Sequence, residues 1–221
     1  VILIEINSPG GSAVASDEIA SAIKNADKPV ISVIREVGAS GGYWVASATD
    51  HIIANRMAIT GSIGVISSYL EFSGLMEKYG VGYERLVAGK YKDLGVPFKE
   101  LKLEEKTILQ GKLDKIHDYF IDEVARNRNM SRTEVKHIAT GEFYLGIEAF
   151  NLGLIDQLGD LSTAEEYMKQ TYGLEEVVYT TYQKEVGLLD VLAGVFDDFF
   201  FRIGEGFGAI IVQSNNNHMF V

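Results

Sequence analysis

Residues 30–48 read VISVIREVGASGGYWVASA, a β-branched run followed by a glycine turn and then by small side chains. The run predicts a buried strand over residues 30–37, and the small residues predict a closely packed helix over residues 43–48. The chain begins in the same order, with an apolar run at residues 1–6 and the turn NSPGGS at residues 7–12. Repetition of strand, glycine turn and helix predicts an α/β fold whose parallel sheet is flanked by helices.

Elements after residue 50 follow from the same patterns. Short strands are predicted at residues 51–54, 63–66, 83–87 and 154–156. Helical spacing covers residues 70–79, 103–127 and 162–172, and the pair Ser131 and Glu134 forms a capping box that predicts another helix start. We divide the chain into an α/β domain at residues 1–170 and a C-terminal region at residues 171–221.

The C-terminal region contains an apolar stretch at residues 188–212 and an Asn-rich tail that ends in His218 to Val221. Aspartates interrupt the apolar stretch, whereas a helix on a membrane surface usually carries lysine or arginine on its polar face. Packing against the core or against another subunit is therefore the favoured interpretation. The tail is interpreted as a solvated end, with self-processing or occupation of a subunit groove as the alternative.

The composition excludes several kinds of chemistry. The 221 residues include no cysteine, which rules out disulfides, thiol nucleophiles and cysteine metal sites. The four histidines are scattered without the spacing of a helical metal site, so we expect no metal. The formal charge is 20 − 31 = −11, which makes nucleic acid an unfavourable partner.

The first residues show no pattern of a targeting segment. They lack the basic region and the cleavage site of a signal peptide and read as a strand, so we expect a piece of a longer protein. No run reaches the roughly 18 uncharged apolar residues that cross a bilayer. The piece is expected to be soluble.

Ser40 is the leading candidate for chemistry. It follows the predicted strand in the pattern Gly-x-Ser-x-Gly, where its hydroxyl would attack a carbonyl while the N–H of Gly41 meets the developing oxyanion. In a parallel sheet the turn at residues 7–12 lies at the same edge, so Gly10 is a candidate second donor, because a residue without Cβ lets the backbone approach a substrate. The alternative is a turn that binds phosphate or only lets the helix pack closely.

A nucleophilic serine needs a base. His117 and His137 fall in charged helices, where a solvated imidazole is expected, and His218 lies in the tail. Lys90 and Lys92 flank Tyr91 in a glycine-led loop, and a lysine acts as a base when it loses its proton near neutral pH. The alternative for each lysine is a surface charge.

Five segments in order resemble one family: residues 7–12 (NSPGGS), 38–43 (GASGGY), 60–65 (TGSIGV), 89–93 (GKYKD) and 153–159 (GLIDQLG). The chain up to about Met168 is similar to the signal peptide peptidase A family of membrane-bound serine proteases. The resemblance implies the Clp protease/crotonase fold with repeated β-β-α/β-α units and a Ser–Lys dyad. It assigns Ser40 as nucleophile, Lys92 as general base, and Gly10 and Gly41 as oxyanion donors. It also assigns Ser62 as the residue that orients the lysine.

The resemblance further implies an endopeptidase that degrades cleaved signal peptides at the cell membrane, with its catalytic part on the extracytoplasmic side. A homo-oligomeric ring, peptide substrates, an anchor outside this chain and no cofactor belong to the same expectation. Whether one chain or two neighbouring subunits complete the dyad stays open. The alternatives are a related protease specific for membrane proteins, a crotonase-like acyl-transfer enzyme and a peptide-binding scaffold without activity.

Overall fold

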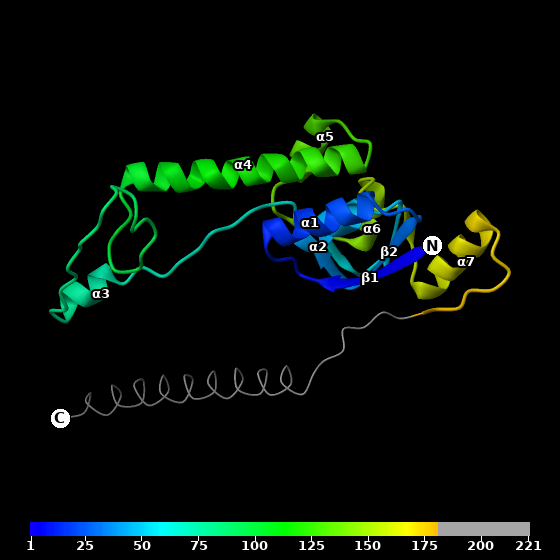
Figure 1. The fold of residues 1–221 in the computed structure, drawn as a ribbon, viewed down its shortest axis with the longest axis horizontal. Coiled ribbons are helices and arrows are strands. Elements are labelled where there is room, and N and C mark those ends of the chain that lie inside the picture. The colour runs from blue at the N-terminus through cyan, green and yellow to red at the C-terminus, as the bar shows by residue number, and fades with distance from the viewer. Residues whose placement is uncertain (181–221) are drawn as a thin grey trace, which may run out of the picture. The chain divides into compact units, whose positions relative to one another are not determined.

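The computed structural model describes residues 1–180, and the stretches 188–212 and 218–221 discussed above lie outside these residues. Residues Val1–Val177 form one unit of the fold. Its elements, shown in Figure 1, are β1 (Ile2–Ser8), α1 (Ala13–Lys24), β2 (Val30–Ala39), α2 (Gly41–Ser47), β3 (His51–Ala54), β4 (Ile59–Gly61), α3 (Ser73–Lys78), α4 (Leu103–Asn127), α5 (Arg132–Ile138), β5 (Phe143–Leu145), α6 (Gly146–Asn151), β6 (Gln157–Leu158) and α7 (Leu161–Tyr172).

β2 is the central strand of a mixed, mostly parallel sheet. β1 pairs with it in parallel, with Ile2 opposite Val30 and Ser8 opposite Gly38. β3 and β4 also pair with β2 in parallel, β3 along residues 31–34 and β4 along residues 37–39. β6 adds to β3 in parallel, whereas β5 is antiparallel to β4. The α/β fold predicted from residues 30–48 is confirmed, with the β4–β5 pair as an antiparallel addition.

Alternate side chains of β2 enter two different cores, because successive side chains of a strand point to opposite faces of the sheet. Ile31 and Val33 pack with Ala164 and Met168 of α7. Ile34 belongs to the larger core, which also contains buried side chains of α2 and α4. Helices therefore cover both faces of β2, as the uninterrupted apolar run of this strand predicts.

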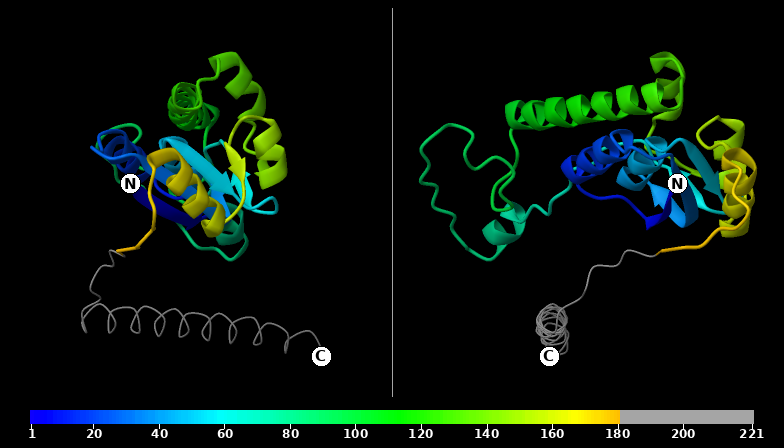
Figure 2. Two further views of the ribbon diagram at one scale, coloured as in Figure 1. Left: turned by 90° about the vertical axis from the view of Figure 1, so that its right-hand side faces the viewer. Right: turned by 45° about the vertical axis from the view of Figure 1, so that its right-hand side comes forward.

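α2 is the predicted small-residue helix, and it is buried along most of its length. Gly42 lets the helix approach the end of β1, since a Cβ there would lie 2.7 Å from the Ser8 carbonyl oxygen. Trp44 stacks on Phe120 of α4, with ring centroids 4.6 Å apart. Figure 1 and the right-hand view of Figure 2 show α4 running alongside α1 and α2. α2 is thus fixed between the sheet and the long helix.

The strand predicted at residues 63–66 is wrong. Ser62 has a φ of 50°, which interrupts extended backbone, and the strand lies earlier, at β4. The Ser62 N–H donates to the Glu142 carbonyl at 2.9 Å, and the Ile63 carbonyl accepts from the Gly141 N–H at 3.2 Å. This part of the chain is hydrogen-bonded to a loop, although Ile63 itself is fully buried.

The strand predicted at residues 83–87 is also absent. The Tyr83 ring lies 5.6 Å from that of Phe98, Arg85 binds Asp93, and the Leu86 side chain is 95% exposed. This segment therefore pairs with no strand in the described part of the chain. The third difference is small, since β6 begins just after the strand predicted at residues 154–156.

The predicted helices agree better with the structure. α4 has the predicted bounds, α7 starts one residue early, and Ser131 caps α5 with Glu134 in the expected capping box. α3 is shorter than residues 70–79 and buries none of its residues. β1 lies in the sheet as predicted; Ile6 of this strand is buried, and Leu3 and Ile4 are half-buried. Within residues 1–180, no helix combines the length and hydropathy needed to cross a bilayer.

The GLIDQLG segment has a structural role in this fold. Asp156 accepts hydrogen bonds from Arg128 Nη2 at 2.6 Å and from the Ile52 N–H at 2.8 Å, which ties the end of α4 to β3. Burial raises the pKa of Asp156, but hydrogen bonds and charge from Arg128 outweigh burial and hold this pKa below its ordinary value. A carboxyl with a lowered pKa in the folded state stabilises the fold at neutral pH.

Asp156→Asn is expected to lower the free energy of unfolding by about 2 kcal/mol at pH 7, because it leaves a buried guanidinium without its counter-charge. A lowered pKa makes the carboxylate contribution complete above the pKa of the unfolded chain, and it is lost as the pH falls through the folded value. The difference between the two proteins should therefore shrink below about pH 4. Urea unfolding measures both values. The exposed Asp114→Asn change on α4 is the control, with an expected effect below about 0.5 kcal/mol.

Candidate active site

The two glycine turns of the sequence lie against each other, as the parallel sheet predicts. A Cβ on Gly10 would lie 2.8 Å from the Gly41 nitrogen and 2.8 Å from the Ser40 Cβ. A Cβ on Gly41 would lie 2.3 Å from the Ser16 Oγ. The φ of Gly10 is 107°, which side-chain-bearing residues rarely adopt. These positions require glycine because the turns approach so closely.

Ser40 occupies a strained backbone conformation between β2 and α2. Its φ is 52° and its ψ is −122°. Its N–H donates to the Gly61 carbonyl at 2.8 Å, and its carbonyl accepts from the Trp44 N–H at 2.9 Å. Its hydroxyl has no hydrogen-bond partner within residues 1–180. A non-glycine residue at positive φ costs of order 1–3 kcal/mol and is concentrated at functional sites. The surrounding hydrogen bonds hold Ser40 in this conformation.

A cavity of about 530 Å³ contains Ser40, Gly41 and Ser62. Its other lining is largely apolar, with Trp44 from α2 and Ile116 and Phe120 from α4. Helical spacing predicts only that these three apolar residues pack within the fold, and it does not predict their place beside the serine. Their helical spacing is equally typical of core residues, so it carries no signal for a cavity.

The two candidate oxyanion donors differ in this structure. Gly41 is the first residue of α2, where a backbone N–H has no partner inside the helix. The Gly10 N–H donates to the Ser8 Oγ at 3.1 Å. Gly41 therefore lines the cavity beside Ser40. Gly10 packs against Gly41, but the Gly10 N–H is already hydrogen-bonded to Ser8.

Ser62 shares the cavity with Ser40. Its hydroxyl donates to the Gly141 carbonyl at 3.1 Å, and its φ is also positive. The structure thus brings Ser40, Gly41 and Ser62 together.

Lys92 is not among the residues that line this cavity. It lies in a turn that follows Gly89, with its N–H donating to the Gly89 carbonyl at 3.1 Å. Its side chain is exposed and makes no hydrogen bond or ion pair within the described residues. The cavity that contains Ser40 therefore has no Lys92 in its described lining.

The structure distinguishes Lys92 from Lys90. The Lys90 amine lies 2.8 Å and 2.9 Å from the two carboxylate oxygens of Glu104, and the Tyr91 hydroxyl donates to the same carboxylate. The hydrogen bond to Glu104 raises the pKa of Lys90, which favours its charged form. A base must be uncharged to accept a proton, so Lys90 is poorly suited to that role, whereas the Lys92 side chain has no such partner within the described residues.

No histidine of residues 1–180 lines the cavity around Ser40. His137 is exposed as expected, but the expectation for His117 is wrong: it is half-buried, with Nε2 at 3.1 Å from the Ile63 carbonyl oxygen. Helical periodicity placed His117 on a charged face, whereas α4 turns this position toward the chain after β4. Neither histidine lines the cavity around Ser40.

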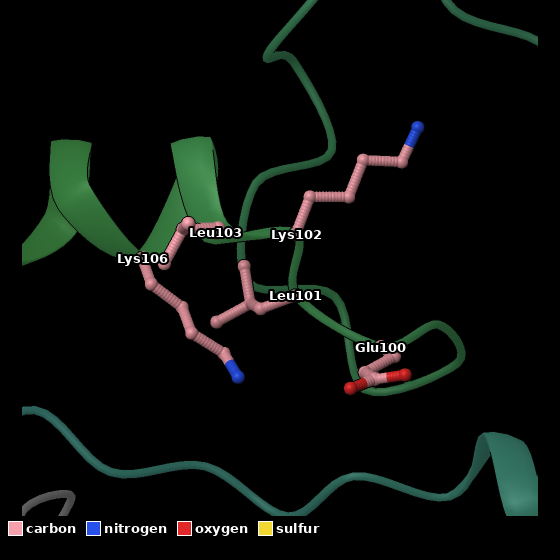
Figure 3. A pocket seen from close by; sticks show the side chains of 5 residues that line it. All are labelled: Glu100, Leu101, Lys102, Leu103 and Lys106. Carbon is pink, nitrogen blue, oxygen red and sulfur yellow. The ribbon is translucent and has the colours of Figure 1, made fainter.

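A second hollow of about 460 Å³ lies at the start of α4, lined by Glu100, Leu101, Lys102, Leu103 and Lys106. Figure 3 shows the side chains of Lys102 and Lys106 pointing in different directions. The lining includes neither Ser40 nor Lys92, so this hollow offers no nucleophile of the kind that the glycine turns present.

A strained serine with a free hydroxyl, beside a backbone N–H in a largely apolar cavity, is the arrangement of a hydrolase that attacks carbonyls through serine. The sequence model of peptidase family S49 matches residues 22–175. The chain belongs to peptidase family S49, a family of serine proteases with the Clp protease/crotonase fold. The fold and the enzyme class predicted from the five sequence segments are confirmed.

Individual relatives agree with this assignment. A Methanocaldococcus jannaschii protein named as a protease is 33% identical over 95% of this chain and 68% of its own length. An Enterococcus faecium protein named as signal peptide peptidase SppA is 37% identical over 83% of this chain and 54% of its own length. The chloroplastic serine protease SPPA of Arabidopsis thaliana is 34% identical over 87% of this chain and 30% of its own length. The chain thus spans from about a third to about two thirds of these relatives.

Proposed function

We propose that the chain is the catalytic part of an endopeptidase that forms an acyl-enzyme through Ser40. The observation that carries this proposal is the strained Ser40 turn, which presents a hydroxyl without a partner to the cavity. The family supports the reaction class, and the comparison of Lys90 with Lys92 supports Lys92 as the base.

In the proposed reaction Lys92 carries a proton between Ser40, the leaving amine and water. The uncharged Lys92 amine takes the Ser40 proton, and the alkoxide attacks the peptide carbonyl carbon. The N–H of Gly41 holds the oxyanion, joined by the N–H of Gly10 once it leaves the Ser8 hydroxyl. The Lys92 ammonium then gives its proton to the leaving amine. Lys92 again acts as base and takes a proton from the water that attacks the acyl-enzyme, and the Lys92 ammonium then returns that proton to the Ser40 oxygen as the acid leaves.

We propose that Ser62 orients the lysine amine through its hydroxyl. Ser62 lies in the same cavity as Ser40, and its hydroxyl donates to a carbonyl, which leaves its oxygen lone pairs for an N–H donor. An amine that enters the cavity would thus be held beside the nucleophile by an acceptor already fixed in place.

We propose apolar peptides as substrates, and cleaved signal peptides as the particular class. Trp44, Ile116 and Phe120 give the cavity a wall that favours apolar side chains. The name of the Enterococcus faecium relative agrees with this substrate. Apolar signal peptides are released at membranes, so a membrane location with an extracytoplasmic catalytic part belongs to the same proposal. The division at residue 170 also stays a prediction.

We propose that a second copy of this chain supplies Lys92. The segment that carries it has many exposed apolar side chains: Ile66, Leu70, Leu75, Tyr79, Val81, Leu86 and Leu103. Figure 1 and the right-hand view of Figure 2 show α3 and its flanking chain apart from the sheet. Contiguous exposed apolar surface is typical of an interface. A neighbouring copy would cover this surface and bring a lysine to a cavity whose described lining contains none, and repetition of such a contact generates a ring.

A serine-reactive fluorophosphonate should label the wild-type chain once, at Ser40, and leave Ser40→Ala unlabelled. The free hydroxyl and the N–H of Gly41 favour attack on phosphorus as they favour attack on a carbonyl. Intact-mass and peptide mass spectrometry measure the label. Equal labelling of both proteins contradicts Ser40 as nucleophile. Thioester turnover that survives Ser40→Ala would instead support the crotonase-like alternative, which needs only the paired glycine turns.

A further inference from the structure

A single guanidinium binds the chain on both sides of Lys92. Arg85 Nη2 donates to Asp93 Oδ1 at 2.8 Å and to the Lys90 carbonyl at 3.2 Å, and its Nε donates to Asp93 Oδ2. Residues 90 and 93 are therefore fixed by the same side chain, while the Lys92 amine between them is left unpaired within the described residues. Arg85 thus holds the loop on both sides of Lys92 without contacting the Lys92 side chain.

The Asp93 carboxylate is also connected to the start of α4. It is 7% exposed, and its Oδ2 lies 3.5 Å from the Lys99 amine. Lys99 binds Glu105 at 2.6 Å, and Glu105 accepts the Lys102 N–H at 2.9 Å. Later turns of α4 line the Ser40 cavity, so the lysine loop and one wall of that cavity belong to one connected structure.

Two ion pairs offset the negative charge of Asp93. Hydrogen bonds from Arg85 hold the pKa of Asp93 well below its ordinary range, which is the expected effect of a carboxylate paired with a guanidinium. An unpaired carboxylate favours the protonated form of an amine that comes within about 4–6 Å of it. Two cations instead neutralise the Asp93 carboxylate.

The charged and titratable groups around this cluster come from several segments. They are Tyr83 and Arg85 before the loop, Lys90, Tyr91 and Asp93 within it, Lys99 after it, and Glu104 and Glu105 from α4. Glu104 is engaged by Lys90 and Glu105 by Lys99. Each acid of the cluster therefore has a basic partner other than Lys92.

We propose that Arg85 is a positioning residue for the catalytic base, acting through Asp93: it neutralises the Asp93 carboxylate and holds the loop from which the Lys92 side chain projects. This inference rests on the proposed role of Lys92. In this proposal Asp93 of the GKYKD segment holds the loop in place through its hydrogen bonds to Arg85. The same hydrogen bonds keep the Asp93 carboxylate from forming an ion pair with Lys92.

Arg85→Gln is expected to move the ascending limb of the kcat/KM–pH profile toward higher pH by about one unit, because the released Asp93 carboxylate then pairs with the neighbouring ammonium. At a pH on the original limb, this shift is about a 10-fold loss of kcat/KM, which is recovered at higher pH. Adding Asp93→Asn should return the limb to its wild-type position, since an amide cannot capture the proton. A profile lowered equally at all pH values, or a double variant that stays shifted, overturns the inference.

Two further variants separate charge from structure. Arg85→Lys keeps the cation and should leave the limb in place, even where the loss of the planar fork lowers kcat. Arg132→Gln removes a guanidinium that binds Asp118 and Asp122 in another part of the protein, and it should not move the limb. Should Arg85→Gln fail to fold by circular dichroism, Lys99→Gln removes the other cation from Asp93 and must move the limb in the same direction.

Competitive acetylation with acetic anhydride tests the same inference without turnover. Mass spectrometry of the Lys92 peptide at a series of pH values should show that Arg85→Gln delays acetylation of Lys92 to higher pH. If Lys92→Ala retains peptide hydrolysis, the proposed dyad fails. If Lys92→Ala is inactive but neither the kinetic limb nor the acetylation profile moves in Arg85→Gln, only the role of Arg85 fails.

Discussion

Ser40→Ala and Lys92→Ala should each lose at least about 10⁴-fold of peptide hydrolysis, and co-expression of the two variants in equal amounts should recover about one quarter of the wild-type activity. Removal of the nucleophile or of its base abolishes the acyl-transfer step. In a mixed ring, a site is active when its Ser40 comes from the Lys92→Ala chain and its Lys92 from the Ser40→Ala neighbour. Random assembly places that ordered pair at about one site in four.

This recovery follows from the placement of Lys92 outside the Ser40 cavity. Turnover of a fluorogenic peptide by purified variants and by the co-expressed mixture measures it, with far-UV circular dichroism to establish that each variant folds. A chain with both substitutions, co-expressed with either single variant, should recover nothing. Because the Lys90 side chain is paired with Glu104, Lys90→Ala is the matched control and should keep most of the activity.

An inactive mixture of folded variants that assemble together would show that the dyad forms within one chain. Retained activity in Lys92→Ala alone would remove lysine from the reaction. These outcomes separate the assignment of the base from the assignment of the subunit that supplies it.

Gly10→Ala should lower kcat by about 10²–10³-fold, the range for loss of an oxyanion donor. The added Cβ would lie 2.8 Å from both the Gly41 nitrogen and the Ser40 Cβ, and the φ of 107° is strained for alanine. The turn must move, and the nucleophile and both proposed donors move with it. Single-turnover measurements of acyl-enzyme formation report the loss directly.

Gly111→Ala is the control for this substitution. A Cβ on Gly111 meets nothing within 4 Å, and alanine favours the helix, so activity should stay unchanged while stability rises slightly. A Gly10→Ala protein with wild-type kcat would mean that the close approach of the two turns has no part in catalysis.

Local chemistry explains which parts of the fold could be predicted. Residues 30–48 carry both the β-branched run and the glycine turn, and the structure confirms β2 and α2 there. The bounds of α4 were predictable because its apolar positions repeat over seven turns. Residues 63–66 were mispredicted because hydrogen bonds to a loop about 80 residues away, and the positive φ of Ser62, decide their conformation.

The candidate site was predictable to a similar degree. The short motifs at the two glycine turns and at Ser62 correctly predicted that these segments lie together. The contribution of Trp44 and Phe120 to the cavity was not predictable, because it depends on how α4 packs on α2. Arg85 lies in the segment wrongly predicted as a strand, and Asp93 lies in the lysine loop. No pattern of residue spacing predicts that these two side chains pair. Sequence patterns also cannot distinguish Lys90 from Lys92, whereas the carboxylate of Glu104 does.

The positive φ of Ser40 has a consequence for the evolution of this chain. Glycine adopts that conformation without strain, so at position 40 stability alone favours replacing the serine. Only selection for the hydroxyl opposes that drift. A lineage that no longer needed the reaction would be expected to replace the serine with glycine and to gain stability by doing so. The residue at position 40 therefore indicates whether a homologue has kept its activity.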